Sequence, residues 1–214
     1  MKRFFLFLPA FFLLSAAWGA PDDSGGPVLT YIKTFPGSTP PYVEIDLMKD
    51  GAGTYQEAPQ DEDPLHFQLS GAEWTQIQNL AGKLDHFSRP LESGLKVANM
   101  GMKTFRYTGP GGPHEVKFNY SEDADARALN EIFDSIMDSE RARIDLETAV
   151  RFDKLGAQNA ILRLEVLRDQ KRLMSPQQFL PMLDRVAKNE SFLHIARERA
   201  ATLAENIRKT SAGN

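Results

Sequence analysis

Residues 101–120 constrain the fold most strongly, because two alternating stretches flank a cluster of glycine and proline there. This pattern is typical of a β-hairpin, with the breakers forming the turn between two strands. Phe105 and Tyr107 share one face of the first strand, since side chains alternate with a period of two. Val116 and Phe118 share one face of the second strand. The stretch therefore predicts two antiparallel strands that present one apolar face to a common core.

The register of this hairpin follows from the requirement that both apolar faces point the same way. A shift by one residue, with Phe105 opposite Lys117, would turn one apolar set toward water. The predicted pairs are Phe105 with Phe118, Tyr107 with Val116 and Gly109 with His114, connected by Pro110–Pro113. Proline lacks a backbone donor and glycine lacks rigidity, so neither residue type extends the ladder well.

The N-terminus has the three-part order of a secretory signal peptide over residues 1–20. Lys2 and Arg3 precede an apolar run from Phe4 to Leu14, and small residues follow. This run is too short for a membrane span, which needs roughly 20 residues. The uncleaved anchor is the alternative. The cleavage position stays open among Ala17, Gly19 and Ala20.

Composition agrees with an exported, soluble protein. The 214 residues carry a net charge of −4, and loss of Lys2 and Arg3 makes it −6, so a nucleic-acid partner has no electrostatic support. The chain has no cysteine, so it must keep its fold in an oxidising compartment without disulfides. We expect a periplasmic or secreted protein that meets the membrane only through its signal peptide, before cleavage.

Four further stretches alternate or are β-branched and predict strands. Asp50 and Gly51 form a good turn dipeptide between the second and third of them. The predicted strands are Val28–Phe35, Tyr42–Lys49, Gly53–Glu57 and Leu65–Leu69, with Leu95–Ala98 as a shorter candidate.

A capping box, Ser70 to Glu73, predicts the start of the first helix, which carries an apolar stripe from Trp74 to Leu84. Residues 122–155 are also helical, as one long helix or as two joined near Ser139. Their predicted buried positions are Leu129, Ile132, Phe133, Ile136, Met137, Ile144, Val150, Phe152 and Leu155, before a C-terminal Gly156.

The remaining chain reads as consecutive helices. One carries Ala160 to Leu167, and Ser175 followed by Pro176 predicts an N-cap with proline at the first helical position. The last predicted helix ends near Lys209 and has Phe192, Ile195, Ala196, Leu203 and Ile207 as its apolar positions.

Together these elements predict an α+β fold. An antiparallel sheet of five or six strands with one or two packed helices occupies residues 21–138, and a C-terminal α-helical bundle of three or four helices occupies residues 139–214.

The stretch PPYVEIDLMKDGAGTY at residues 40–55, followed by the LSGAEW helix start, resembles the N-terminal part of small exported bacterial proteins, of acidobacterial type, that have no assigned activity. The resemblance covers residues 28–138 and implies export and fold. Members often carry cysteines just before the Pro-x-Tyr strand. This chain has none, so a redox or metal role linked to those cysteines does not carry over.

Few histidine or carboxylate side chains in the sequence have a spacing typical of catalytic or metal-binding sites. His66 and His114 would meet only if their strands were neighbours on the polar face, and surface histidines are the simpler interpretation. The acidic run Asp61–Asp63 suits either a calcium loop or a solvated connection. We find no zinc-ligand spacing, nucleophile elbow or phosphate-binding loop. We therefore assign no catalytic, cofactor-binding or metal-ligating residue.

These observations favour a non-enzymatic protein of the cell envelope that binds another envelope protein through its helical segment. Two alternatives stay open. One is an extracytoplasmic hydrolase with a dispersed site, which needs a pocket with a histidine or carboxylate of shifted pKa. The other is a carrier of a small ligand, which needs a cavity.

Overall fold

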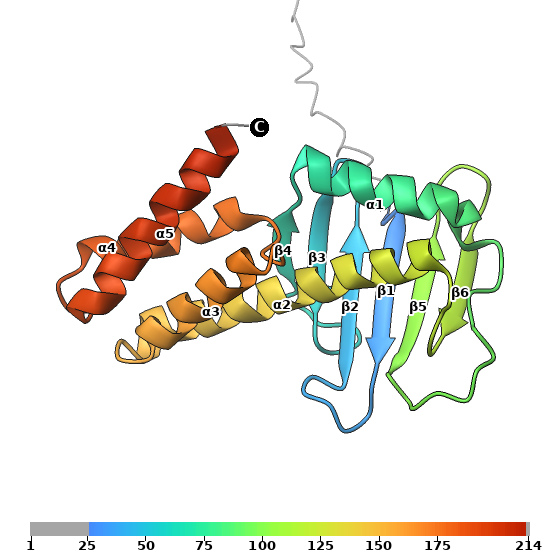
Figure 1. Ribbon diagram of the computed structural model, residues 1–214, viewed down its shortest axis with the longest axis horizontal. Coiled ribbons are helices and arrows are strands. Elements are labelled where there is room, and N and C mark those ends of the chain that lie inside the picture. Colours follow the sequence, from blue (N-terminus) through green and yellow to red (C-terminus); the bar gives the residue numbers. More distant parts are fainter. Residues whose placement is uncertain (1–25, 213–214) are drawn as a thin grey trace, which may run out of the picture.

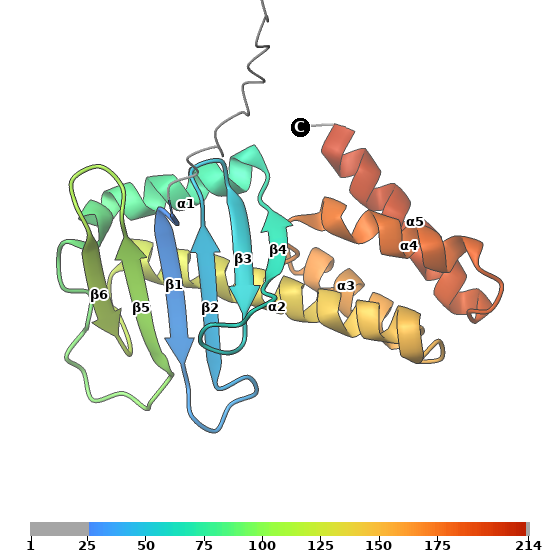
Figure 2. The same ribbon diagram turned by 180° about the vertical axis from the view of Figure 1, so that it is seen from behind.

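The computed structural model describes residues 26–212 and has an α+β architecture. A six-stranded antiparallel sheet has the order β4-β3-β2-β1-β5-β6, and two helices cover one of its faces (Figures 1 and 2). The strands are β1 Leu29–Thr34, β2 Tyr42–Leu47, β3 Ala52–Gln56, β4 Leu65–Gln68, β5 Met102–Tyr107 and β6 His114–Phe118. The prediction of a short strand at Leu95–Ala98 is wrong, because these residues belong to the loop before β5. The predicted signal peptide, residues 1–20, lies outside the described residues.

The hairpin of β5 and β6 forms with a register two residues away from the predicted one. Phe105 lies opposite Val116, Lys103 opposite Phe118 and Tyr107 opposite His114. A shift by two keeps every side chain on its face, so the predicted apolar face is confirmed while the individual pairs are wrong. The connection covers residues 108–113 instead of 110–113, and within it Gly111 and Gly112 adopt positive φ, 104° and 102°, which glycine tolerates without strain.

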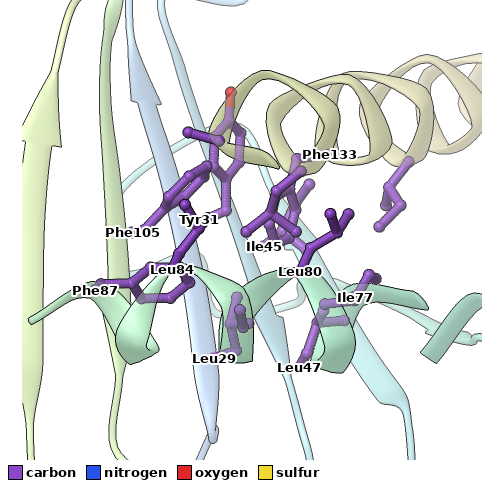
Figure 3. Packing of buried hydrophobic residues seen from close by; sticks show 14 of the residues in the cluster. Leu29, Tyr31, Ile45, Leu47, Ile77, Leu80, Leu84, Phe87, Phe105 and Phe133 are labelled. Atoms are coloured by element: carbon purple, nitrogen blue, oxygen red, sulfur yellow. The ribbon is translucent and has the colours of Figure 1, made fainter. Parts of the chain in front are cut away.

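An aromatic cluster fills the space between the sheet and its helices (Figure 3). Tyr31 stacks on Phe133 with ring centroids 4.5 Å apart, and Phe105 lies 5.1 Å from both Phe87 and Phe118. Such ring pairs contribute about 0.5–1.5 kcal/mol beyond the area they bury. These rings come from distant parts of the chain, so the cluster fixes the sheet and helices relative to one another.

Helix α1, Gly71–Lys83, begins as the sequence predicts. The Glu73 backbone N–H donates to Ser70 Oγ at 3.3 Å, and the Ser70 N–H donates to the Glu73 carboxylate at 2.7 Å. This reciprocal pair satisfies two backbone donors at the helix start. Trp74, Ile77 and Leu80 face the sheet and are buried.

Helix α2 is one continuous helix, Ala124–Phe152, which answers the question left open at residues 122–155. Its N-cap is Asp123, whose carboxylate accepts from the N–H groups of residues 125 and 126. The predicted boundary between residues 138 and 139 falls inside α2. Up to Ile136 the helix packs on the sheet, and from Ala142 its buried residues belong to a second hydrophobic cluster.

The second half of α2 leaves the sheet and forms an arm with the remaining helices (Figure 1). These are α3 Ala157–Asp169, the short 3₁₀ helix η2 Pro176–Phe179, α4 Leu180–Lys188 and α5 His194–Ala212. The arm is two consecutive helical hairpins, α2 with α3 and α4 with α5. Within residues 26–212, no helix combines the length and the apolar character needed to span a bilayer.

Of three predicted helix ends in the arm, two are close to their predicted positions and one is wrong. Ser175 is the N-cap residue of η2, with Pro176 at the first helical position as predicted, but Ser175 adopts a left-handed conformation, φ 48°, and its side chain forms no capping hydrogen bond. Gly156 has an ordinary φ of −71° and begins α3, whereas Asp153 is the C-cap of α2. The last helix continues past Lys209 to Ala212.

Candidate interaction surface

Four large apolar side chains are exposed at the far end of the arm. Phe152 is 82% exposed and Leu155 is 72% exposed, at the turn between α2 and α3. Leu193 and Ile195, at the turn between α4 and α5, are 43% and 44% exposed. Single exposed apolar residues are common on soluble proteins, whereas several at one end of a molecule form a candidate contact surface.

A contact between the two turns places them side by side. Lys154 Nζ, in the first turn, lies 5.9 Å from the ring centroid of Phe192, in the second. Both turns lie at the same end of the arm, away from the sheet (Figures 1 and 2). We call Phe152, Leu155, Leu193 and Ile195 the distal apolar tip.

The distal apolar tip corrects the sequence analysis, which expected Phe152, Leu155 and Ile195 to face a core. Val150, two residues before Phe152, is only 4% exposed. The apolar pattern of α2 continues past Val150 to Phe152. No other helix of the described chain covers this last turn of α2. Periodicity finds an apolar stripe without telling whether a partner covers it, so the stripe was visible in the sequence and its exposure was not.

A buried polar network fixes the arm on the sheet. Arg143 of α2 donates to the His66 carbonyl of β4 at 2.7 Å and to the Gln178 side chain at 2.8 Å. The Gln178 amide donates in turn to Glu140 at 2.8 Å, and Arg143 lies 3.1 Å from the other oxygen of that carboxylate. Burial raises the pKa of Glu140, against the lowering effect of Arg143. No sequence pattern indicates this network, because its members come from three separate segments and share no spacing.

Two backbone contacts strengthen the same junction. The Ser175 N–H donates to Glu73 of the capping box at 3.0 Å, and the Met174 N–H donates to Ser139 Oγ at 2.8 Å. The linker between α3 and η2 is thereby held against both α1 and α2. The distal apolar tip is therefore held at one end of an arm whose other end is fixed.

The structure does not bring the candidate histidines together. His66 lies on β4 and His114 on β6, which are the two opposite edges of the sheet. They also point to opposite faces, since His66 alternates with buried Phe67 while His114 pairs with Tyr107 on the covered face. The hypothesis that these strands are neighbours on the polar face is wrong.

The acidic run Asp61–Asp63 lies in the exposed connection between β3 and β4, where the Asp63 N–H donates to the Asp61 carboxylate at 3.1 Å. Among residues 26–212, no cluster of three or more histidine and carboxylate side chains is arranged to hold a metal ion.

One carboxylate on the uncovered sheet face, Asp46, has a raised pKa. Burial raises the pKa of Asp46, and the 2.5 Å hydrogen bond donated by Thr30 opposes that shift. Glu44, two residues away on the same face, adds to the upward shift.

Comparison with protein-family models, with curated proteins and with solved structures gave no match.

Proposed function

We propose that this protein is a non-enzymatic interaction module of the cell envelope, and that its helical arm presents the distal apolar tip to another envelope protein. The observation that carries the proposal is the exposure of Phe152, at 82%, beside Leu155, at 72%. Burying apolar surface gains about 25 cal/mol per Å², and aromatic anchors dominate many protein interfaces. Export through residues 1–20 would bring the protein to that compartment.

Charge around the tip indicates the character of the partner. Arg151, Lys154 and Lys188 flank the two turns, against Asp153 and Glu190, so the surroundings are slightly cationic. The chain after residue 20 is acidic overall, with the expected net charge of −6. A second copy would bring like charges together at the tip. An apolar site with an acidic rim on a different protein is the better match.

The proposal is tested by capturing partners from an envelope extract with residues 21–214 as bait. We expect a near-stoichiometric partner that the wild type retains and that F152S/L155S loses. The matched control is L162S/V166S, because Leu162 and Val166 are also exposed, at 41% and 44%, but lie on the outer side of α3. Far-UV circular dichroism checks that all three proteins keep their helices.

Two outcomes contradict the proposal. One is a partner that F152S/L155S retains as well as the control does, and the other is the absence of any partner with the wild type. Sedimentation of the wild type alone distinguishes self-association: a dimer that F152S/L155S loses would assign the tip to a second copy instead.

A further inference from the structure

Lys103 of β5 is a buried cation on the covered face of the sheet. The residue is only 5% exposed. Its ammonium group donates to the Asn119 carbonyl at 2.7 Å and to the Met100 carbonyl at 3.2 Å. An ammonium has three N–H donors, so these two bonds leave one for another acceptor.

The charges around Lys103 leave it without a carboxylate partner. Lys33 lies directly opposite on β1 and pairs with Asp134 of α2 at 2.8 Å. Within residues 26–212, Lys103 forms no ion pair of its own. Burial lowers its pKa, and the charge on Lys33 lowers it further, although Asp134 and Glu92 oppose this. A buried charge without a counter-charge is costly, and a bound anion would reduce that cost.

A cavity of about 180 Å³ lies beside Lys103, between the start of α2 and the end of β6. Arg127 lines it as a second cation and forms no ion pair within the described part of the chain. Asn130 adds a polar side chain, and Met100, Phe118 and Tyr120 add apolar surface. Glu131 is the one carboxylate in the lining. The cavity thus combines two unpaired cations with an apolar wall.

We propose that this cavity binds a small organic molecule through a carboxylate group. The carboxylate accepts from the free N–H of Lys103 and from the Arg127 guanidinium, which favours planar anions. The short apolar part of the ligand lies against Phe118 and Met100. Glu131 favours a ligand that also carries an amino group, so a small amino acid fits better than a simple fatty acid.

The test is calorimetric titration of residues 21–214 with propionate, alanine and inorganic phosphate, each at matched ionic strength. We expect saturable binding of alanine and weaker binding of propionate. Arg127→Gln should weaken both by about tenfold, the usual loss for one charge-assisted hydrogen bond. Lys96→Gln, in the exposed loop before β5, is the matched control and should leave binding unchanged.

Lys103→Met should abolish binding, but Lys103 also holds the loop through Met100, so this variant could lose the fold. Arg127 is exposed, so Arg127→Gln decides the matter without that risk. Glu131→Gln separates the ligand types: it should weaken alanine binding and strengthen propionate binding. Failure of both carboxylates to saturate, equal binding by Arg127→Gln and Lys96→Gln, or phosphate binding as tight as alanine would overturn the proposal.

Discussion

The sheet and the arm are built around cores of different kinds. The sheet core contains stacked rings, and its largest fully buried side chains include Tyr31, Tyr55, Phe87, Phe105 and Phe133. The arm core is rich in small residues, among them Ala142, Ala157, Ala160, Ala196, Ala200 and Ala204. Large rings fill the space between a sheet and its helices, whereas alanines let helix backbones approach closely.

This difference explains where apolar surface is left uncovered. In the sheet unit, α1 and the first half of α2 together cover one face (Figure 3). In the arm, a helix is buried only where a neighbouring helix runs beside it. The helix ends at the distal apolar tip have no such neighbour, so their apolar side chains are exposed to solvent. Position along α2 therefore decides whether a phenylalanine stabilises the fold or is available for a partner.

The sharpest test of the comparison uses two phenylalanines of the same helix. Phe133→Ala should lower the free energy of unfolding by about 3–5 kcal/mol, because the ring is fully buried. Phe152→Ala should change it by less than about 0.5 kcal/mol, because that ring is exposed. Urea denaturation followed by circular dichroism measures both. Similar losses for the two variants would contradict the difference in packing.

The junction between the two units gives the next largest effect. Arg143→Met should cost about 3 kcal/mol, because it leaves the Glu140 carboxylate buried without its cation. The substitution should also make the sheet and the arm unfold in two separate transitions. Trp74 is the one tryptophan after residue 20 and reports on the sheet by fluorescence, while circular dichroism follows all helices.

The two signals should coincide in the wild type and diverge in Arg143→Met, with the arm unfolding first. Arg151→Met removes an exposed arginine of the same helix and serves as the control. Coincident transitions in Arg143→Met would show that the network does not couple the units.

Replacing a buried alanine with a larger residue tests whether the helices of the arm must pack closely together. Ala200→Leu should cost about 1–3 kcal/mol, since Ala200 is fully buried between helices. Ala201→Leu places the same side chain on the exposed side of α5 and should be nearly neutral. Thermal unfolding distinguishes them. Equal stability of the two variants would mean that the helices can move apart at little cost.

The smallest effect concerns pH. Burial raises the pKa of Glu140 in the folded protein, so the folded state binds this proton more tightly than the unfolded state does. Between the unfolded pKa, about 4.3, and the higher folded value, stability therefore falls as pH rises. Glu140→Gln should remove this part of the pH dependence, measured as the denaturation midpoint against pH. The exposed Glu190→Gln should retain it.

Most element positions could be predicted from the sequence, because they depend on local patterns. The capping box at Ser70 has its predicted geometry, and the four early strands form within one or two residues of their expected bounds. The hairpin shows the limit of such reasoning. Alternation fixes a face but not a pairing, since a shift by two residues preserves it, and the connection between β5 and β6 is two residues longer than predicted.

The candidate sites depend on contacts between distant segments, which no spacing reveals. Alternation along β5 places Lys103 on the same face as Phe105, but it does not show which charges surround the ammonium group. Lys103 has no carboxylate partner because the neighbouring strand β1 places Lys33 opposite it. Residues of α2 line the cavity beside it.

The sequence by itself determined the α+β class, the order of the elements and the apolar stripe that continues along α2, because periodicity and capping are local properties of the chain. Only the tertiary structure decided that α2 serves both units, that Arg143 and Glu140 fix the arm, and that the stripe ends uncovered at Phe152. The physical reason is that burial depends on which segments meet, and that is determined by packing over the whole chain.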